Sequence, residues 1–65
     1  MPIPFTELIQ EAISVLQDTI KTTNAIDIDL LAHKLAVAKN EPKWYCREAV
    51  YAAVKKMNLM KEVVG

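Results

Sequence analysis

The chain has few of the residues that usually stabilise so small a protein. Its 65 residues include one cysteine, one histidine and, at the very end, one glycine. A lone cysteine cannot form an internal disulfide or supply a cysteine-rich zinc site. A domain near sixty residues buries only about 60% of its unfolded surface, so its stability must come from dense apolar packing or from a second subunit. The length allows a single domain, residues 1–65.

Residues suited to catalysis are equally scarce. A Cys–His nucleophile pair needs both side chains within hydrogen-bonding reach, but Cys46 falls on the apolar face of one expected helix and His33 borders the far side of another. With Gly65 as the only glycine, the chain has no phosphate-binding loop. Helix capping explains Asp27 and Asp29 more simply than weak cation binding does. We therefore expect no enzyme activity, no metal and no cofactor.

Long apolar runs are missing too. No stretch reaches the roughly 18 apolar residues that a membrane-spanning helix needs. The first residues, Met1 to Phe5, lack the basic region and the apolar run of a signal peptide. A single cysteine fits a reducing compartment. The sequence therefore predicts a cytoplasmic protein without a membrane partner.

The chain lacks net charge, because eight Lys and Arg residues balance eight Asp and Glu residues. The charges are nevertheless segregated along the sequence. Residues 1–33 carry five acidic residues and one lysine, a net charge of −4, whereas residues 34–65 carry seven basic and three acidic residues, a net charge of +4. Such asymmetry points to nucleic acid or to another partner of opposite charge. Two amphipathic helices whose solvated faces differ in sign would explain it equally well.

Apolar residues, in contrast, are abundant: they make up 52% of the chain and recur at helical spacing. The i, i+3, i+4 pattern predicts helices over about 5–21, 29–38 and 43–58, and hence a mostly α, three-helix domain. Asn40 and Pro42 mark the break before the third helix, since Asn suits a left-handed C-cap and Pro suits a first helical turn.

Two segments also have features of short strands. Apolar and acidic side chains alternate around residues 25–28, and residues 59–64 are mainly apolar but too short for another helix. Asp27 suits the N-cap of the second helix as well. The sequence therefore allows short strands over 25–28 and 59–64, and it also allows residues 25–28 to lead into a helix capped by Asp27.

The outer faces of the second and third helices carry two further stripes of large side chains. Leu30 and Val37 lie seven residues apart on the side of the second helix away from its main apolar face. Trp44 and Tyr51 have the same spacing on the third helix, beside Arg47. Trp, Tyr and Arg are enriched at the hot spots of protein interfaces. Leu30, Val37, Trp44 and Tyr51 are therefore predicted to form a homodimer interface.

The segment DIDLLAHKLA, residues 27–36, is similar to the first helix of a helix-turn-helix motif, with Leu31-Ala32 at the characteristic Leu-Ala pair. The segment REAVYAAVKKMNLM, residues 47–60, is similar to a recognition helix that runs into a wing strand. Over residues 26–64 the chain thus resembles a winged helix-turn-helix DNA-binding domain.

This resemblance implies that the third helix enters the major groove, with Arg47 as a guanine contact, and that two copies pair on a two-fold symmetric site. The nucleic-acid-binding residues that it implies are Lys39, Lys43, Trp44, Arg47, Tyr51, Lys55 and Lys56. The predicted function is that of a small DNA-binding regulator of transcription acting as a homodimer. The alternative is a non-enzymatic module that binds a partner protein, or an obligate helical homodimer, without nucleic-acid binding.

Overall fold

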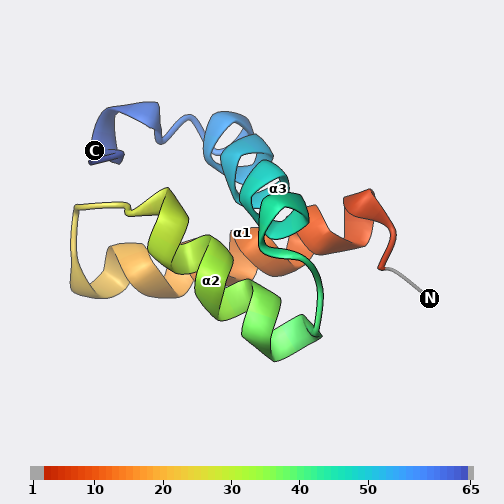
Figure 1. Ribbon diagram of the computed structural model, residues 1–65. Helices are drawn as coiled ribbons and strands as arrows, with labels where there is room; N and C mark the ends of the chain where they lie inside the picture. The colour runs from red at the N-terminus through yellow and green to blue at the C-terminus, as the bar shows by residue number, and fades with distance from the viewer. Residues whose placement is uncertain (1–2, 65) are drawn as a thin grey trace.

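Three α-helices make up most of the computed structural model, which describes residues 3–64 (Figure 1). They are α1 (Phe5–Thr22), α2 (Ile28–Lys39) and α3 (Lys43–Lys56), followed by a single 3-10 turn, η1 (Met60–Glu62). The prediction of a mostly α, three-helix domain is confirmed. The bounds of the helices differ from the predicted ones by one or two residues at the ends.

Local capping residues set where α2 begins and ends. The Oδ1 atom of Asp27 accepts a hydrogen bond from the Leu30 backbone N–H at 3.2 Å, so Asp27 is the N-cap. Asn40 has φ 54° and ψ 48°, and the next N–H, that of Glu41, donates to the Ala36 carbonyl at 3.1 Å. This is the left-handed ending that Asn tolerates well. Only residues 40–42 therefore separate α2 from α3, within the three- to four-residue length of a helix-turn-helix turn.

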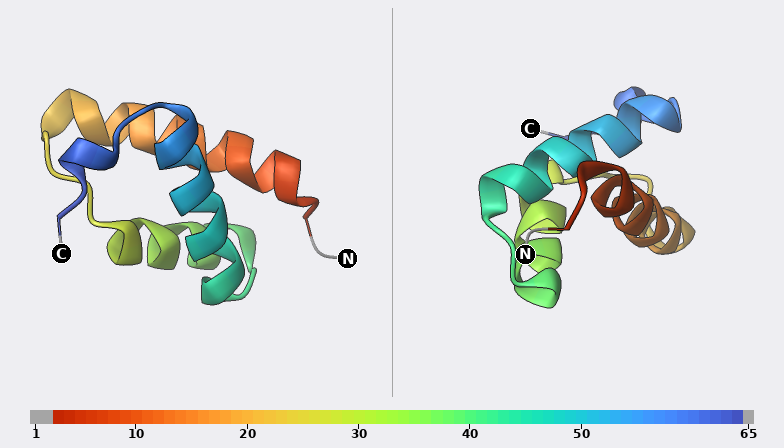
Figure 2. Two further views of the ribbon diagram at one scale, coloured as in Figure 1. Left: turned by 90° about the horizontal axis from the view of Figure 1, so that it is seen from above. Right: turned by 90° about the vertical axis from the view of Figure 1, so that its right-hand side faces the viewer.

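The core forms where α3 lies across α1 and α2, which point in roughly opposite directions (Figure 2). The helix α3 packs against both of the others, whereas α1 and α2 touch each other much less. The buried side chains come from one face of each helix and from the α1–α2 connection: Leu8, Ala12, Leu16, Ile26, Ile28, Leu31, Ala32, Leu35, Cys46, Ala49, Val50, Ala53 and Val54. Because α1 and α2 both pack on the same side of α3, the opposite face of α3 is exposed to solvent.

The N-terminal residues fasten the start of α1 to the start of α3. The Ile3 N–H donates to Glu41 Oε2 at 3.0 Å, and the Tyr45 hydroxyl donates to the Ile3 carbonyl at 2.6 Å. The rings of Phe5 and Tyr45 pack with their centroids 5.8 Å apart. These contacts stabilise the position of the first turn of α3, which also carries Trp44.

The short strands predicted over 25–28 and 59–64 are wrong, because the described residues make one isolated parallel bridge between Ile26 and Val63. The Ile26 N–H donates to the Glu62 carbonyl at 2.7 Å, and the Val64 N–H donates to the Ile26 carbonyl at 2.9 Å. The pairing goes no further because Asp27 already caps α2 on one side, while residues 60–62 coil into a 3-10 turn on the other.

The predicted end of the third helix, residue 58, is also corrected. Asn58 has φ 59°, and the N–H of Leu59 donates to the Val54 carbonyl at 2.9 Å. This is a Schellman ending, in which a left-handed residue turns the chain away from the helix. The helix α3 therefore stops at Lys56.

Candidate functional site

The solvent-facing side of α3 gathers most of the predicted nucleic-acid-binding residues. Trp44 and Tyr51 lie opposite the buried face and are 69% and 41% exposed. Lys55 is exposed beside them, with its Nζ 5.2 Å from the centroid of the Tyr51 ring, a cation–π distance. Lys43 and Arg47 occupy the flank of α3 that faces the start of α2. These five side chains form what we call the α3 surface: Lys43, Trp44, Arg47, Tyr51 and Lys55.

Two predicted members do not lie on this surface. Lys39, in the last turn of α2, pairs with Glu11 of α1 at 3.1 Å, so its charge is directed toward α1. Lys56 is exposed, but its helical position places it on the same flank of α3 as Tyr45, which packs against α1. The α3 surface is therefore less basic than the sequence alone indicates.

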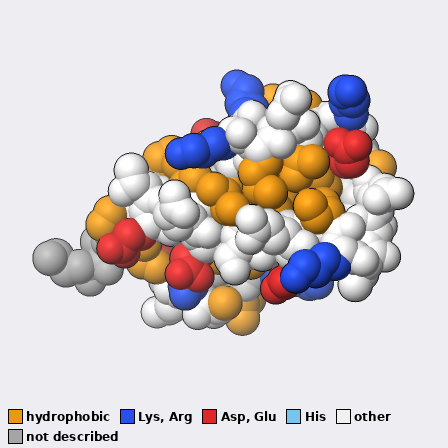
Figure 3. Space-filling view, turned by 180° about the vertical axis from the view of Figure 1, so that it is seen from behind, with side chains coloured by type: hydrophobic (Ala, Val, Ile, Leu, Met, Phe, Trp, Pro, Cys, Tyr) orange, Lys and Arg blue, Asp and Glu red, His pale blue; other side chains and the backbone are white. Residues whose placement is uncertain are grey.

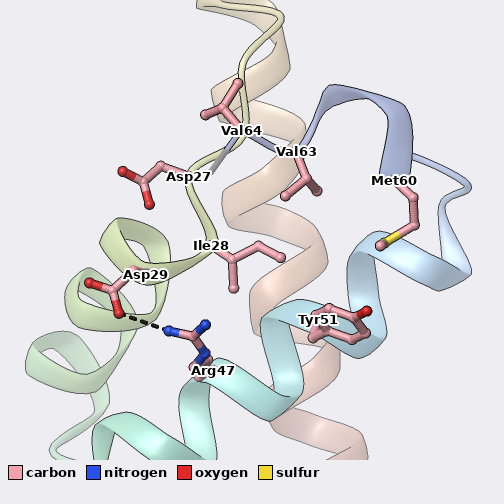
Figure 4. Close-up of a pocket in the computed structure, with 8 residues that line it drawn as sticks. All are labelled: Asp27, Ile28, Asp29, Arg47, Tyr51, Met60, Val63 and Val64. Atoms are coloured by element: carbon pink, nitrogen blue, oxygen red, sulfur yellow. Dashed lines mark hydrogen bonds and ion pairs between the residues drawn. The ribbon is translucent and has the colours of Figure 1, made fainter.

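Asp29 holds the two cations on the α2 flank of the α3 surface. Its Oδ2 atom lies 3.0 Å from Lys43 Nζ. Its Oδ1 atom lies 3.0 Å from Arg47 Nη1, the contact drawn as a dashed line in Figure 4. The hydrogen bond from Lys43, together with the charges of Lys43 and Arg47, lowers the pKa of Asp29. The ion pairs therefore persist to a lower pH than the ordinary pKa of an aspartate would allow, and they are lost as the pH falls through the lowered pKa.

The contact of Asp29 with Lys43 and Arg47 could not be predicted from the spacing of these residues. Asp29 precedes Lys43 by 14 residues and Arg47 by 18, so no helical spacing relates it to either cation. The sequence predicts only that Asp29 lies in the first turn of α2, where it is found. Tertiary packing of α3 on α2 brings the three charges together.

A groove runs alongside this charged cluster, between the start of α2, the middle of α3 and the C-terminal tail (Figure 4). Its volume is about 370 Å³. Polar groups come from Asp27, Asp29 and Arg47, while Tyr51 and the tail supply much of the apolar wall. The apolar tail residues that line it, which were not predicted as site residues, are Met60, Val63 and Val64. They reach the groove because the bridge at Ile26 holds the tail against the start of α2.

The four residues predicted as a dimer interface fall on two separate surfaces. Val37 and Leu30 face away from the core on α2 and are 71% and 49% exposed. Leu30 lines a depression with the end of α1, whereas Tyr51 lines the groove beside α3. A partner that covered Trp44 and Tyr51 would thus approach from a different side than one that covered Leu30.

A small apolar hollow lies at the start of α3. Glu41, Pro42, Trp44 and Tyr45 line its volume of about 350 Å³. The Trp44 and Tyr45 rings are 5.6 Å apart, so they form one aromatic edge of the hollow. Trp44 is therefore more than an isolated exposed side chain, because it belongs to a concave apolar surface.

The reverse side of the molecule has a different character. Figure 3 shows apolar side chains gathered in the middle of this face, with charged groups toward its edges. The helix α1 crosses this side, and its partly buried isoleucines, Ile9, Ile13 and Ile20, share one flank by their helical spacing. The α3 surface, in contrast, combines aromatic with cationic groups.

Cys46 and His33 lie on different helices and differ in burial. Cys46 is fully buried, and burial raises the pKa of its thiol, which favours the unreactive protonated form. His33 is exposed on α2. Within residues 3–64 no three His, Cys, Asp or Glu side chains are grouped so as to hold a metal ion.

Across the same described range, none of the helices combines the length and apolar character needed to cross a membrane. Comparison of the chain with protein-family models, with curated proteins and with solved structures finds no significant match. Any function must therefore be argued from the site itself.

Proposed function

We propose that this protein binds duplex DNA through the α3 surface and regulates transcription as a small helix-turn-helix dimer. The observation that carries the proposal is the three-residue turn between α2 and α3, which leaves the cationic and aromatic side of α3 uncovered. The location proposed is the cytoplasm, where the free, buried thiol of Cys46 stays reduced.

In this proposal the exposed side of α3 lies in the major groove, as the second helix of a helix-turn-helix does. Arg47 presents the planar donor group that pairs with guanine, and Tyr51 and Trp44 provide apolar contact to the bases. Lys55 contacts a phosphate from the α3 surface, and Lys56 reaches a second phosphate from the neighbouring flank of α3. These contacts add affinity without sequence information. Two copies on a two-fold symmetric site would double these contacts.

The described tail does not form the wing of a winged helix-turn-helix motif. Among the described residues the tail makes one bridge with Ile26 and lines the groove beside Tyr51, so it offers no two-stranded wing. Recognition is therefore assigned to α3 alone. This limits the number of phosphate contacts and predicts moderate affinity.

Binding to random-sequence duplex DNA, measured by fluorescence anisotropy, tests the proposal. With two phosphate contacts, from Lys55 and Lys56, the affinity should fall roughly 12-fold between about 50 mM and 200 mM salt, because each contact adds about −0.9 to the slope of log K against log salt. Failure to bind at the lower salt concentration would overturn the proposal. Binding that does not vary with salt would also contradict it.

The alternative, a protein-interaction module or a helical homodimer without nucleic acid, is favoured by the hollow around Trp44. An exposed Trp in a concave apolar surface is typical of interaction hot spots. Sedimentation of the wild type and of Trp44→Ala at micromolar concentration separates the candidates. A dimer that Trp44→Ala dissociates, together with absence of DNA binding, would favour the alternative.

A further inference from the structure

The two basic residues nearest α2 on the α3 surface are already occupied by an anion from the same chain. Lys43 and Arg47 each bind a different oxygen of the Asp29 carboxylate at 3.0 Å. All three side chains are about half exposed, so a large anion in solvent can reach them. An anion from solvent can therefore replace the Asp29 carboxylate at Lys43 and Arg47.

A carboxylate and a phosphodiester present similar oxygens to ammonium and guanidinium groups. We propose that Asp29 is an autoinhibitory group that occupies the place of a DNA phosphate oxygen and competes with DNA for Lys43 and Arg47. This inference rests on the proposed DNA-binding function and concerns the control of its affinity. DNA must displace Asp29 before Lys43 can neutralise a phosphate and before Arg47 can reach a base.

The position of Asp29 adds to the competition. It lies in the first turn of α2, a helix end that would otherwise attract phosphate through its free N–H groups. The neighbouring Asp27 puts a second carboxylate on the same rim of the groove and uses its Oδ1 atom to cap α2. The N-terminus of α2 therefore repels the DNA backbone unless Lys43 and Arg47 offset the negative charge of the two carboxylates.

Asp29→Asn tests the inference, because it removes the competing charge with little change in shape. Since two exposed ion pairs are lost, affinity for random duplex DNA should rise about threefold to tenfold at about 50 mM salt. The slope of log K against log salt should steepen by about 0.9, the contribution of one additional phosphate contact. Circular dichroism before and after heating checks that the variant is folded.

Glu48→Gln is the matched control. Glu48 is an exposed carboxylate on α3 beside Arg47 and Tyr51, and no ion pair joins it to another described residue. The inference expects a smaller gain in affinity for Glu48→Gln than for Asp29→Asn. Equal gains would show a general effect of net charge and would overturn it, as would an unchanged affinity of Asp29→Asn.

The same titrations distinguish a failure of the proposed DNA binding from a failure of the autoinhibitory role alone. If neither the wild type nor Asp29→Asn binds DNA at low salt, the proposed function fails, and the inference fails with it. If the wild type binds and Asp29→Asn binds no better than Glu48→Gln, only the autoinhibitory role is overturned.

Discussion

Leu16→Ala is expected to lower the free energy of unfolding by about 2–5 kcal/mol and to leave most of the protein unfolded at room temperature. Leu16 is fully buried on the α1 face that packs on the core. A chain of this length has little stability in reserve, and it has no disulfide to limit the loss. Loss of the helical circular dichroism signal, followed in a urea titration, measures the effect.

Leu30→Ala is the control for this prediction, because it makes the same chemical change at a leucine that is about half exposed on α2. It should change the free energy of unfolding by less than about 1 kcal/mol, since little cavity forms and Ala is the better helix former. Equal urea midpoints for the two variants would contradict the packing described for α1. Leu16→Val, a smaller truncation, supplies an intermediate point if Leu16→Ala does not fold.

Arg47→Gln is expected to raise the Kd for a preferred duplex roughly 5- to 150-fold, which corresponds to about 1–3 kcal/mol for one base-reading arginine. Arg47 stands between the start of α2 and the exposed side of α3, where a helix-turn-helix meets the bases. Because the side chain is exposed, its replacement should leave the fold intact. Anisotropy titration against duplexes varied at each position measures both affinity and discrimination.

Lys34→Gln removes the same single charge from a site away from the α3 surface. Lys34 is exposed on α2 and lines the depression toward the end of α1. Its replacement should change the affinity by less than about threefold, the size of a general, screened charge effect. If Lys34→Gln weakened binding as much as Arg47→Gln, the α3 surface would not be the DNA-binding surface.

The three helices could be predicted from the sequence because their determinants are local. Apolar side chains at helical spacing define one buried face on each helix, and these faces form the observed core. The caps at Asp27 and Asn40 depend on residues within four or five positions of each other, so they are visible in the sequence. The same holds for the exposed positions of Trp44 and Tyr51, which follow from the buried face of α3.

The C-terminal segment could not be predicted in this way. Its apolar residues suit a strand, but Asn58 turns the chain and residues 60–62 form a 3-10 turn. One bridge to Ile26 then fixes where the tail lies. This contact depends on how α3 lies across the other helices. That arrangement cannot be predicted from the spacing of residues close in the sequence.

The sequence by itself determined the helical class, the break before the third helix and the side of α3 that faces solvent, because each depends on residues close in the chain. The tertiary structure alone decided which charges remain available. Packing of α3 on α2 places Asp29 between Lys43 and Arg47, and packing of α2 beside α1 pairs Lys39 with Glu11. Positive and negative charges therefore balance locally as well as over the whole chain. Long-range ion pairs engage three basic residues on which DNA binding was predicted to depend: Lys39, Lys43 and Arg47.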